Sequence, residues 1–75
     1  MSGQTLGRMI ASLRKERGMT QAEVAEKISI AYRNYQRLEA NGNTPNFSNL
    51  VQLADLFDVS MDYLAGRTDV REVNR

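Results

Sequence analysis

Apolar residues in the first part of the chain recur at the spacing of an amphipathic helix. Leu6, Met9, Ile10 and Leu13 fall at i, i+3, i+4 and i+7, so they line one face of a helix. The sequence ERG then ends the pattern, because Gly18 is a natural left-handed stop and the basic residues before it suit the negative end of the helix dipole. We therefore expect a first helix from Leu6 to the turn at Gly18.

A second, shorter helix is expected after the sequence TQAE. Thr20 can cap its first turn and Glu23 can return a hydrogen bond to the cap residue, which is the capping-box pattern. Ser29 interrupts the apolar pattern about two turns later, so the helix is expected to end there. Its inward residues are Val24, Ala25 and Ile28.

A third helix is expected from residue 31 or 32 to residue 39 or 40, before the turn-forming sequence NGNTP. Ala31, Tyr35 and Leu38 share one narrow face of this helix, which we expect in the core. The opposite face carries hydrogen-bonding side chains almost throughout: Tyr32, Arg33, Asn34, Gln36 and Arg37. Such a face is either solvated surface or a surface that binds another molecule.

The strongest apolar stripe in the chain predicts a fourth helix after Pro45. Either Thr44 or Asn46 is expected to cap it. The members of the stripe lie at i, i+3, i+4, i+7 and i+10: Phe47, Leu50, Val51, Ala54 and Phe57.

The sequence DVSMDYLAG predicts a turn, a cap at Ser60, a short fifth helix through Leu64 and a stop at Gly66. No strand alternation and no internal repeat is present. We therefore expect residues 1–75 to form a single all-α domain, a compact bundle of five short helices with a core of about residues 5–66. Residues 67–75 are expected to form a tail that frays or contributes to a dimer.

Composition narrows the classes of function. The chain has 75 residues, 41% of them apolar and 25% charged, which suits one globular domain. It has no apolar run long enough to span a bilayer and no signal-peptide pattern, so we expect a cytoplasmic protein without membrane contact. Without cysteine or histidine, and with no spacing that assembles a catalytic carboxylate, lysine or serine, an enzyme, a metal site and a cofactor are not expected.

The charges are divided unevenly along the chain. Residues 1–38 carry seven basic and three acidic residues, a net charge of +4, whereas residues 39–75 carry three basic and six acidic residues, a net charge of −3. This asymmetry indicates one basic surface for a polyanion and a different surface for something else.

Two segments together resemble a known family. TQAEVAEKISIAYRNYQRLEANG resembles the helix-turn-helix of the lambda repressor and Cro-like (XRE-type) family, and VSMDYLAGRTD resembles the fifth-helix ending in that family. The resemblance covers about residues 5–69. Two positions depart from it: Ser29 stands where the family often has glycine, so the turn is either strained or different in detail. Asn41 must act as the left-handed residue after the third helix.

The resemblance implies that the third helix lies in the major groove of DNA with its first half against the base edges. Arg33 and Arg37 suit guanine, Asn34 or Gln36 could pair with adenine, and Tyr32 could contact a sugar, a thymine methyl group or a phosphate.

Further roles follow from the same resemblance. Phosphate contacts are expected from the start of the second helix and the loop after the third: Thr20, Gln21, Asn43, Thr44 and Asn46. Arg14 is expected to pair with Glu39 as a structural brace between the first and third helices. Dimer contacts are expected around the fifth helix: Val59, Met61, Tyr63 and Leu64, with Val70 and Val73 if the tail is ordered.

These features indicate sequence-specific binding to double-stranded DNA. The expected protein is a small prokaryotic or phage transcriptional regulator, a repressor that binds a palindromic operator as a homodimer, with half-sites about 34 Å apart. One alternative is the antitoxin of a toxin–antitoxin pair, which would also bind a toxin protein with its acidic half. A second alternative is a protein-interaction module that does not bind DNA.

Overall fold

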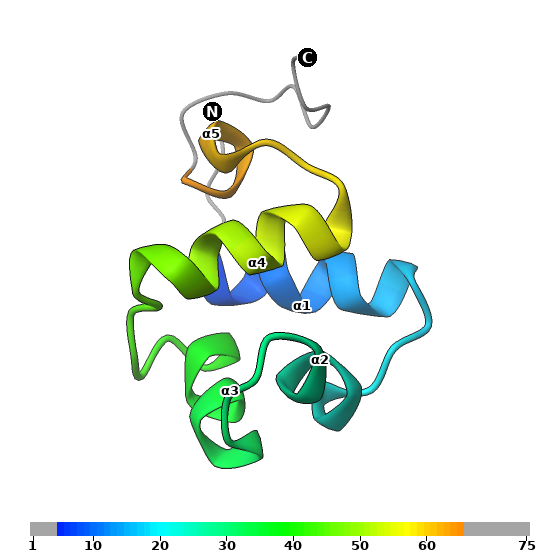
Figure 1. Cartoon of the computed structure of the whole chain (residues 1–75), viewed down its shortest axis with the longest axis vertical. Helices are drawn as coiled ribbons and strands as arrows, with labels where there is room; N and C mark the ends of the chain where they lie inside the picture. Colours follow the sequence, from blue (N-terminus) through cyan, green and yellow to red (C-terminus); the bar gives the residue numbers. More distant parts are fainter. Residues whose placement is uncertain (1–4, 66–75) are drawn as a thin grey trace.

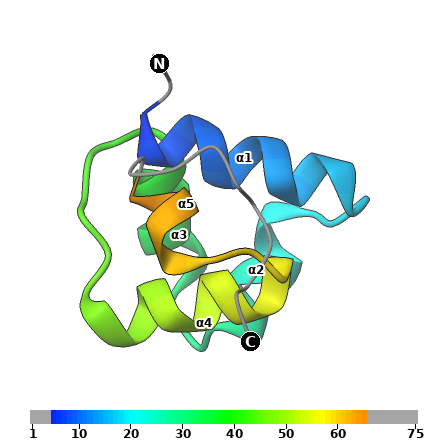
Figure 2. The same ribbon diagram turned by 90° about the horizontal axis from the view of Figure 1, so that it is seen from above.

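The computed structural model describes residues 5–65, and within that range the chain forms five α-helices and no strand. They are α1 (Leu6–Glu16), α2 (Gln21–Lys27), α3 (Tyr32–Glu39), α4 (Phe47–Phe57) and α5 (Met61–Leu64). Figure 1 shows α2 and α3 together at one end, α1 and α4 across the middle, and α5 at the opposite end. Seen from above, α1 and α4 run along two sides of the molecule, with α5 between them (Figure 2). The predicted all-α fold with a central helix-turn-helix is confirmed.

Four of the five helices begin at a side-chain cap. The predicted capping box of α2 is present: Thr20 Oγ1 accepts from the amide of Glu23 at 3.1 Å, and the Glu23 carboxylate accepts from the amide of Thr20 at 2.7 Å. Ser60 caps α5 as predicted, and of the two candidates for the cap of α4, Asn46 is the one that caps. Helix α3 begins at Ala31 without a side-chain cap.

The ends of the first four helices share one backbone arrangement. A residue in the left-handed region follows each helix, and its own amide and the amide of the next residue donate to carbonyl groups of the last turn, which is the Schellman motif. The left-handed residues are Gly18 (φ +65°), Ser29 (+59°), Asn41 (+62°) and Asp58 (+54°). Gly18 and Asn41 were predicted in this role. The question left open for Ser29 is answered: it adopts the conformation that glycine favours.

The core is apolar and is built from all five helices and the turn before α5. The buried side chains are Met9, Ile10, Leu13, Val24, Ala25, Ile28, Tyr35, Leu38, Leu53, Ala54, Phe57, Val59 and Leu64. Within residues 5–65 no helix is long and apolar enough to cross a membrane.

The predicted core of α3 and α4 needs three corrections. Ala31 is exposed because it is the cap residue of α3 and precedes the first helical turn. Leu50 and Val51 of the predicted α4 stripe are only partly buried. Phe47 is 76% exposed, whereas Leu53 is buried, because the inward face of α4 is rotated from the predicted stripe towards Leu53 and Phe57.

A close contact between α1 and the end of α3 requires glycine at position 7. A Cβ atom there would lie 2.4 Å from the carbonyl oxygen of Glu39 and 2.6 Å from that of Leu38. The Asn41 side chain completes the contact: its Oδ1 accepts from the amide of Gly7 at 3.0 Å, and its Nδ2 donates to Oγ1 of Thr5 at 2.9 Å. The start of α1 is therefore fixed to the end of α3.

The other end of α1 is attached to α4. The guanidinium of Arg17 donates to the carbonyl oxygen of Phe57 in the last turn of α4. That carbonyl belongs to the negative end of the α4 dipole, so a cation is favoured beside it.

Replacing Gly7 with alanine should lower the free energy of unfolding by about 2–3 kcal/mol, because the backbone of two packed helices must move to admit the methyl group. Urea denaturation measures this. Gly42→Ala is the matched control, since its Cβ would meet no atom closer than 3.6 Å and its cost should stay below about 0.5 kcal/mol. Equal effects of the two substitutions would contradict the close contact at Gly7.

Ser29→Gly should raise the free energy of unfolding by about 0.5–1 kcal/mol, because glycine removes the strain of the left-handed backbone and this gain exceeds its higher entropy in the unfolded chain. The same substitution at Ser12, which is exposed within α1, should destabilise by about 0.5 kcal/mol. Thermal denaturation of the pair should therefore give shifts of opposite sign.

Candidate nucleic-acid interface

The outward face of α3 gathers the five residues expected to contact bases. Tyr35 and Leu38 hold the opposite side of the helix in the core. Tyr32, Arg33, Asn34, Gln36 and Arg37 are all exposed, and Tyr32 is 50% exposed. Helix α3 lies with α2 at one end of the molecule, away from α5 (Figure 1). The face is therefore polar, basic and accessible.

The carboxylate of Glu39 is turned inward and joins three helices. Arg14 of α1 donates to it twice, from Nε to Oε2 at 2.6 Å and from Nη2 to Oε1 at 3.1 Å. Gln21 of α2 donates from Nε2 to Oε1 at 3.0 Å, and the hydroxyl of Tyr35 donates to Oε2. The side chains of Arg14 and Glu39 are only 13% and 8% exposed. Arg14 also donates to the carbonyl oxygen of Met19 at 3.0 Å, which holds the loop before α2.

These contacts change the pKa values of the three groups. Burial alone would raise the pKa of Glu39, but the hydrogen bonds from Arg14, Tyr35 and Gln21 outweigh it and hold that pKa below its ordinary value. The hydrogen bond to Glu39 raises the pKa of Arg14 further. Burial, and then the neighbouring carboxylate, raise the pKa of the Tyr35 hydroxyl. At neutral pH, Glu39 is therefore an anion whose charge is neutralised inside the fold.

Glu39 is the only acidic residue of α3, and it faces inward. No acidic side chain of α3 therefore lies beside Arg33 and Arg37 on the outward face. This electrostatic arrangement favours a polyanion on that face.

The expected phosphate-contact residues surround the same end of the molecule. Asn34 of α3 and residues of the loop after α3 line one hollow of about 290 Å³. The hollow is lined by Ile30, Asn34, Leu38, Asn43, Thr44, Pro45, Asn46 and Asn49. One candidate for base contact and three candidates for phosphate contact are thus brought together.

Three of the expected phosphate contacts already have partners within the fold. Thr20 Oγ1 accepts from the amide of Glu23, Oδ1 of Asn46 accepts from the amide of Asn49, and the side-chain amide of Gln21 donates to Glu39. No local pattern in the sequence signals this role of Gln21, because its partner lies 18 residues further along the chain.

The dimer candidates are divided between core and surface. Val59 and Leu64 are each 2% exposed and belong to the core, so they cannot offer a surface to a second subunit. That part of the expectation is wrong, because α5 uses these two residues to close the bundle. Met61 and Tyr63 are partly buried against the core. Val70 and Val73 lie outside the described residues.

No group of three or more acidic side chains in residues 5–65 lies close enough together to hold a metal ion. The chemistry of the described surface is that of hydrogen bonds and charge.

Comparison with known proteins agrees with this geometry. The model of the helix-turn-helix family HTH_3 matches residues 10–64. The HTH-type transcriptional regulator ImmR of Bacillus subtilis (strain 168) is 36% identical over 70 residues, which are 93% of this chain and 55% of ImmR. The chain therefore spans about half the length of the curated relatives that it matches.

Two of the similar solved structures contain DNA. The P22 c2 repressor in complex with a synthetic operator superposes with a TM-score of 0.81 at 26% identity, covering 87% of this chain and 98% of that one. SinR from Bacillus subtilis in complex with DNA superposes with a TM-score of 0.75 at 31% identity, covering 81% and 98%.

Glu39→Gln should lower the free energy of unfolding by about 1–3 kcal/mol at pH 7, because a neutral amide cannot satisfy the donors of Arg14 and Tyr35. The pKa of Glu39 in the folded state lies below its unfolded value of about 4.3, so the ionised carboxylate stabilises the fold above about pH 4.3. This stabilisation is lost as the pH falls through the folded-state pKa. The difference from wild type should therefore shrink in acid.

Urea denaturation at pH 7 and at about pH 3 tests this. Glu26→Gln removes the same charge from an exposed site on α2 and should change the free energy of unfolding by less than about 0.5 kcal/mol at either pH. An unchanged penalty of Glu39→Gln at the two pH values would show that the carboxylate is not ionised in the native fold.

Proposed function

Because the chain belongs to the helix-turn-helix family HTH_3, we propose that it is a transcriptional regulator that represses by binding operator DNA with the outward face of α3. One observation carries the proposal: five exposed polar side chains on α3 stand opposite the buried Tyr35 and Leu38, and the carboxylate of that helix is neutralised inside the fold. The P22 c2 repressor and SinR, both solved in complex with DNA, support it.

In this proposal α3 lies in the major groove, and each side chain has a chemical role there. Arg33 and Arg37 present planar guanidinium groups that match the two acceptors of guanine. Asn34 and Gln36 present amides that match the donor and acceptor of adenine. Tyr32, at the first turn of α3, contacts a sugar, a thymine methyl group or a phosphate. Each good pair contributes about 1–3 kcal/mol of discrimination between bases.

Phosphate groups are held on both sides of α3. At the start of α2, the hydroxyl hydrogen of Thr20 and the second amide hydrogen of Gln21 remain to donate, since their known bonds use other atoms. In the loop after α3, Asn43 and Thr44 are exposed, and Asn46 keeps its amide donors while its oxygen caps α4.

A single domain reads only a few base pairs, so we propose that two copies bind a palindromic operator, with half-sites about 34 Å apart. Since Val59 and Leu64 are buried, Tyr63 and Met61 are the remaining candidates within the described residues for the contact between copies. Occupation of the operator would exclude the polymerase. This role places the protein in the cytoplasm, on the nucleoid.

Selection of binding sites from a random duplex pool tests the proposal. We expect a palindromic sequence whose affinity falls steeply with salt, because phosphate contacts release counterions. Arg33→Ala should weaken the selected site by about 1–3 kcal/mol and relax preference at one position in each half-site.

The control is Arg33→Lys, which keeps the charge but loses the two-pronged contact to guanine. It should retain the salt dependence of wild type and lose the base preference. Affinity that is equal for all sequences in wild type, or base preference unaffected by both variants, would refute base reading by α3.

A further inference from the structure

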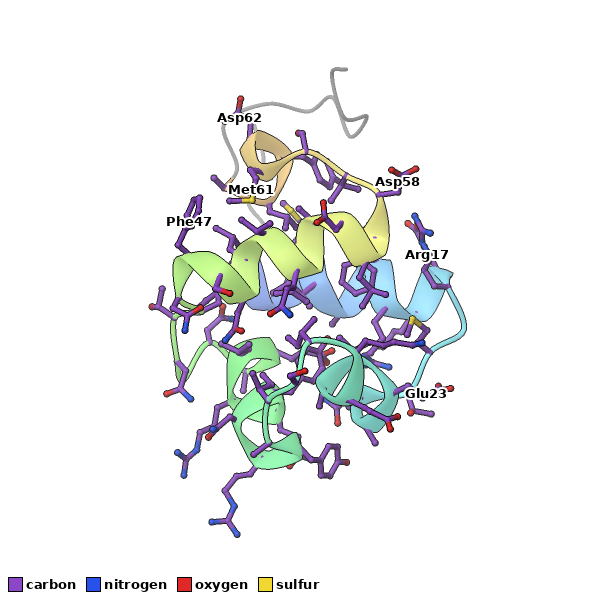
Figure 3. All side chains as sticks on the ribbon, in the orientation of Figure 1. Arg17, Glu23, Phe47, Asp58, Met61 and Asp62 are labelled. Carbon is purple, nitrogen blue, oxygen red and sulfur yellow. The ribbon has the colours of Figure 1, made fainter. Side chains whose placement is uncertain are left out.

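One edge of α4 carries an apolar line that starts at the surface and runs into the core. Phe47 is 76% exposed, Val51 at i+4 is partly exposed and Ala54 at i+7 is buried, so the three side chains lie along one face of the helix. Figure 3 shows Phe47 at the start of α4, on the same side of the molecule as Met61 at the start of α5. Most of the Phe47 side chain is left uncovered by the described fold.

The line leads into a groove between the two last helices. This α4–α5 groove has a volume of about 290 Å³ and is lined by Val51, Ala54, Asp55, Val59, Ser60, Met61 and Asp62. Ala54 and Val59 form a buried floor, whereas Val51 and Met61 are partly exposed at its sides. The groove is large enough to take apolar side chains from outside.

The two charged side chains that line the groove are both acidic. From Ala40 to Ala65 the chain carries three acidic residues, Asp55, Asp58 and Asp62, and no basic residue. Asp55 and Asp62 both line the groove, and both are exposed. The basic residues of the described range all lie between Arg8 and Arg37. An apolar floor with acidic edges is complementary to a segment that is apolar on one face and basic at its margins.

We propose that the α4–α5 groove, extended by Phe47, is a docking site for an amphipathic basic helix of another protein. Apolar side chains of that helix at i, i+3, i+4 and i+7 pack over Phe47, Val51 and Met61, which is the helix-in-groove mode of recognition. Its lysine or arginine side chains pair with Asp55 and Asp62. This site is separate from the DNA interface and does not depend on the proposed operator binding.

Charge argues against the two other occupants. In a two-fold dimer whose axis passed through the groove, Asp55 and Asp62 would lie close to the same acids of the second copy. A nucleic acid would be repelled by the same two carboxylates. Met61 then contacts the partner helix, and Tyr63 is left as the described candidate for contact between two copies of the chain.

The position of the groove decides whether its partner and DNA can bind at the same time. Figure 1 shows α5 at the end of the molecule opposite α2 and α3. A helix in the groove would therefore leave the outward face of α3 uncovered, so the partner and DNA can be held at the same time.

The probe that tests the site is a phage-displayed library of short helical peptides, with apolar residues fixed at i, i+3, i+4 and i+7 and all other positions random, selected on the full 75-residue chain. We expect lysine and arginine to be enriched. Binding of the best peptide should fall at least about tenfold with the double variant D55N/D62N, and also with Phe47→Ser. When the peptide binds, the backbone amide signals of the chain that shift in its nuclear magnetic resonance spectrum should centre on Val51, Ala54 and Met61.

The control is Glu26→Gln, which removes an exposed acid from α2, at the end of the molecule away from the groove, and should leave peptide binding unchanged. Because Phe47, Asp55 and Asp62 are exposed and lie outside the proposed DNA interface, their variants should unfold like wild type and keep its affinity for the selected operator. That operator assay separates failure of this site from failure of the DNA-binding proposal.

Three results would overturn the proposal. The first is selection of acidic or uncharged peptides. The second is binding that survives D55N/D62N or maps to another surface. The third is self-association of the chain in sedimentation equilibrium that Phe47→Ser abolishes, since the occupant would then be a second copy.

Discussion

The carboxylate of Glu39 is the point at which α1, α2 and α3 are held together. A carboxylate that is 8% exposed is costly to bury unless hydrogen-bond donors surround it. Arg14, Gln21 and Tyr35 supply those donors from three different helices. All of them reach the two oxygens in one arrangement of the helices, so the network specifies how α3 is oriented as well as contributing to stability.

This constraint shapes the DNA-binding candidate directly. The only acid of α3 is turned into the fold, and the outward side keeps its two arginines. The end of α3 is fixed a second time, because Gly7 lets α1 approach it closely and Asn41 bonds back to the start of α1. A short helix that is attached at both its buried face and its end can hold its outward side chains in a well-defined position.

The parts of the fold that could be predicted depend on residues close together in the sequence. The capping box of α2, the caps at Asn46 and Ser60, and the left-handed Gly18 and Asn41 each involve residues within about one turn of helix. The contact of Gly7 with α3 and the bond from Arg17 to Phe57 join segments more than thirty residues apart, and no local pattern signals them. Periodicity also did not identify the inward face of α4. Phe47 fits the apolar stripe, but it is the first residue of the helix and lies beyond the edge of the core.

For the candidate site, the helical wheel of α3 was sufficient to separate the buried Tyr35 from its polar neighbours. The pairing of Arg14 with Glu39 came from family resemblance, and the base contacts stay a prediction.

The separation of charge along the described domain would also affect how the domain approaches DNA in the proposed function. The described basic residues lie in α1, α2, α3 and the turn after α1, whereas between Ala40 and Ala65 the only charged residues are acidic. The described domain therefore carries an electric dipole moment along its length, and the field of a DNA duplex exerts a torque on it before the surfaces touch. The end with α2 and α3 turns towards the phosphates and the acidic end turns away, so a larger share of encounters begins in the productive orientation.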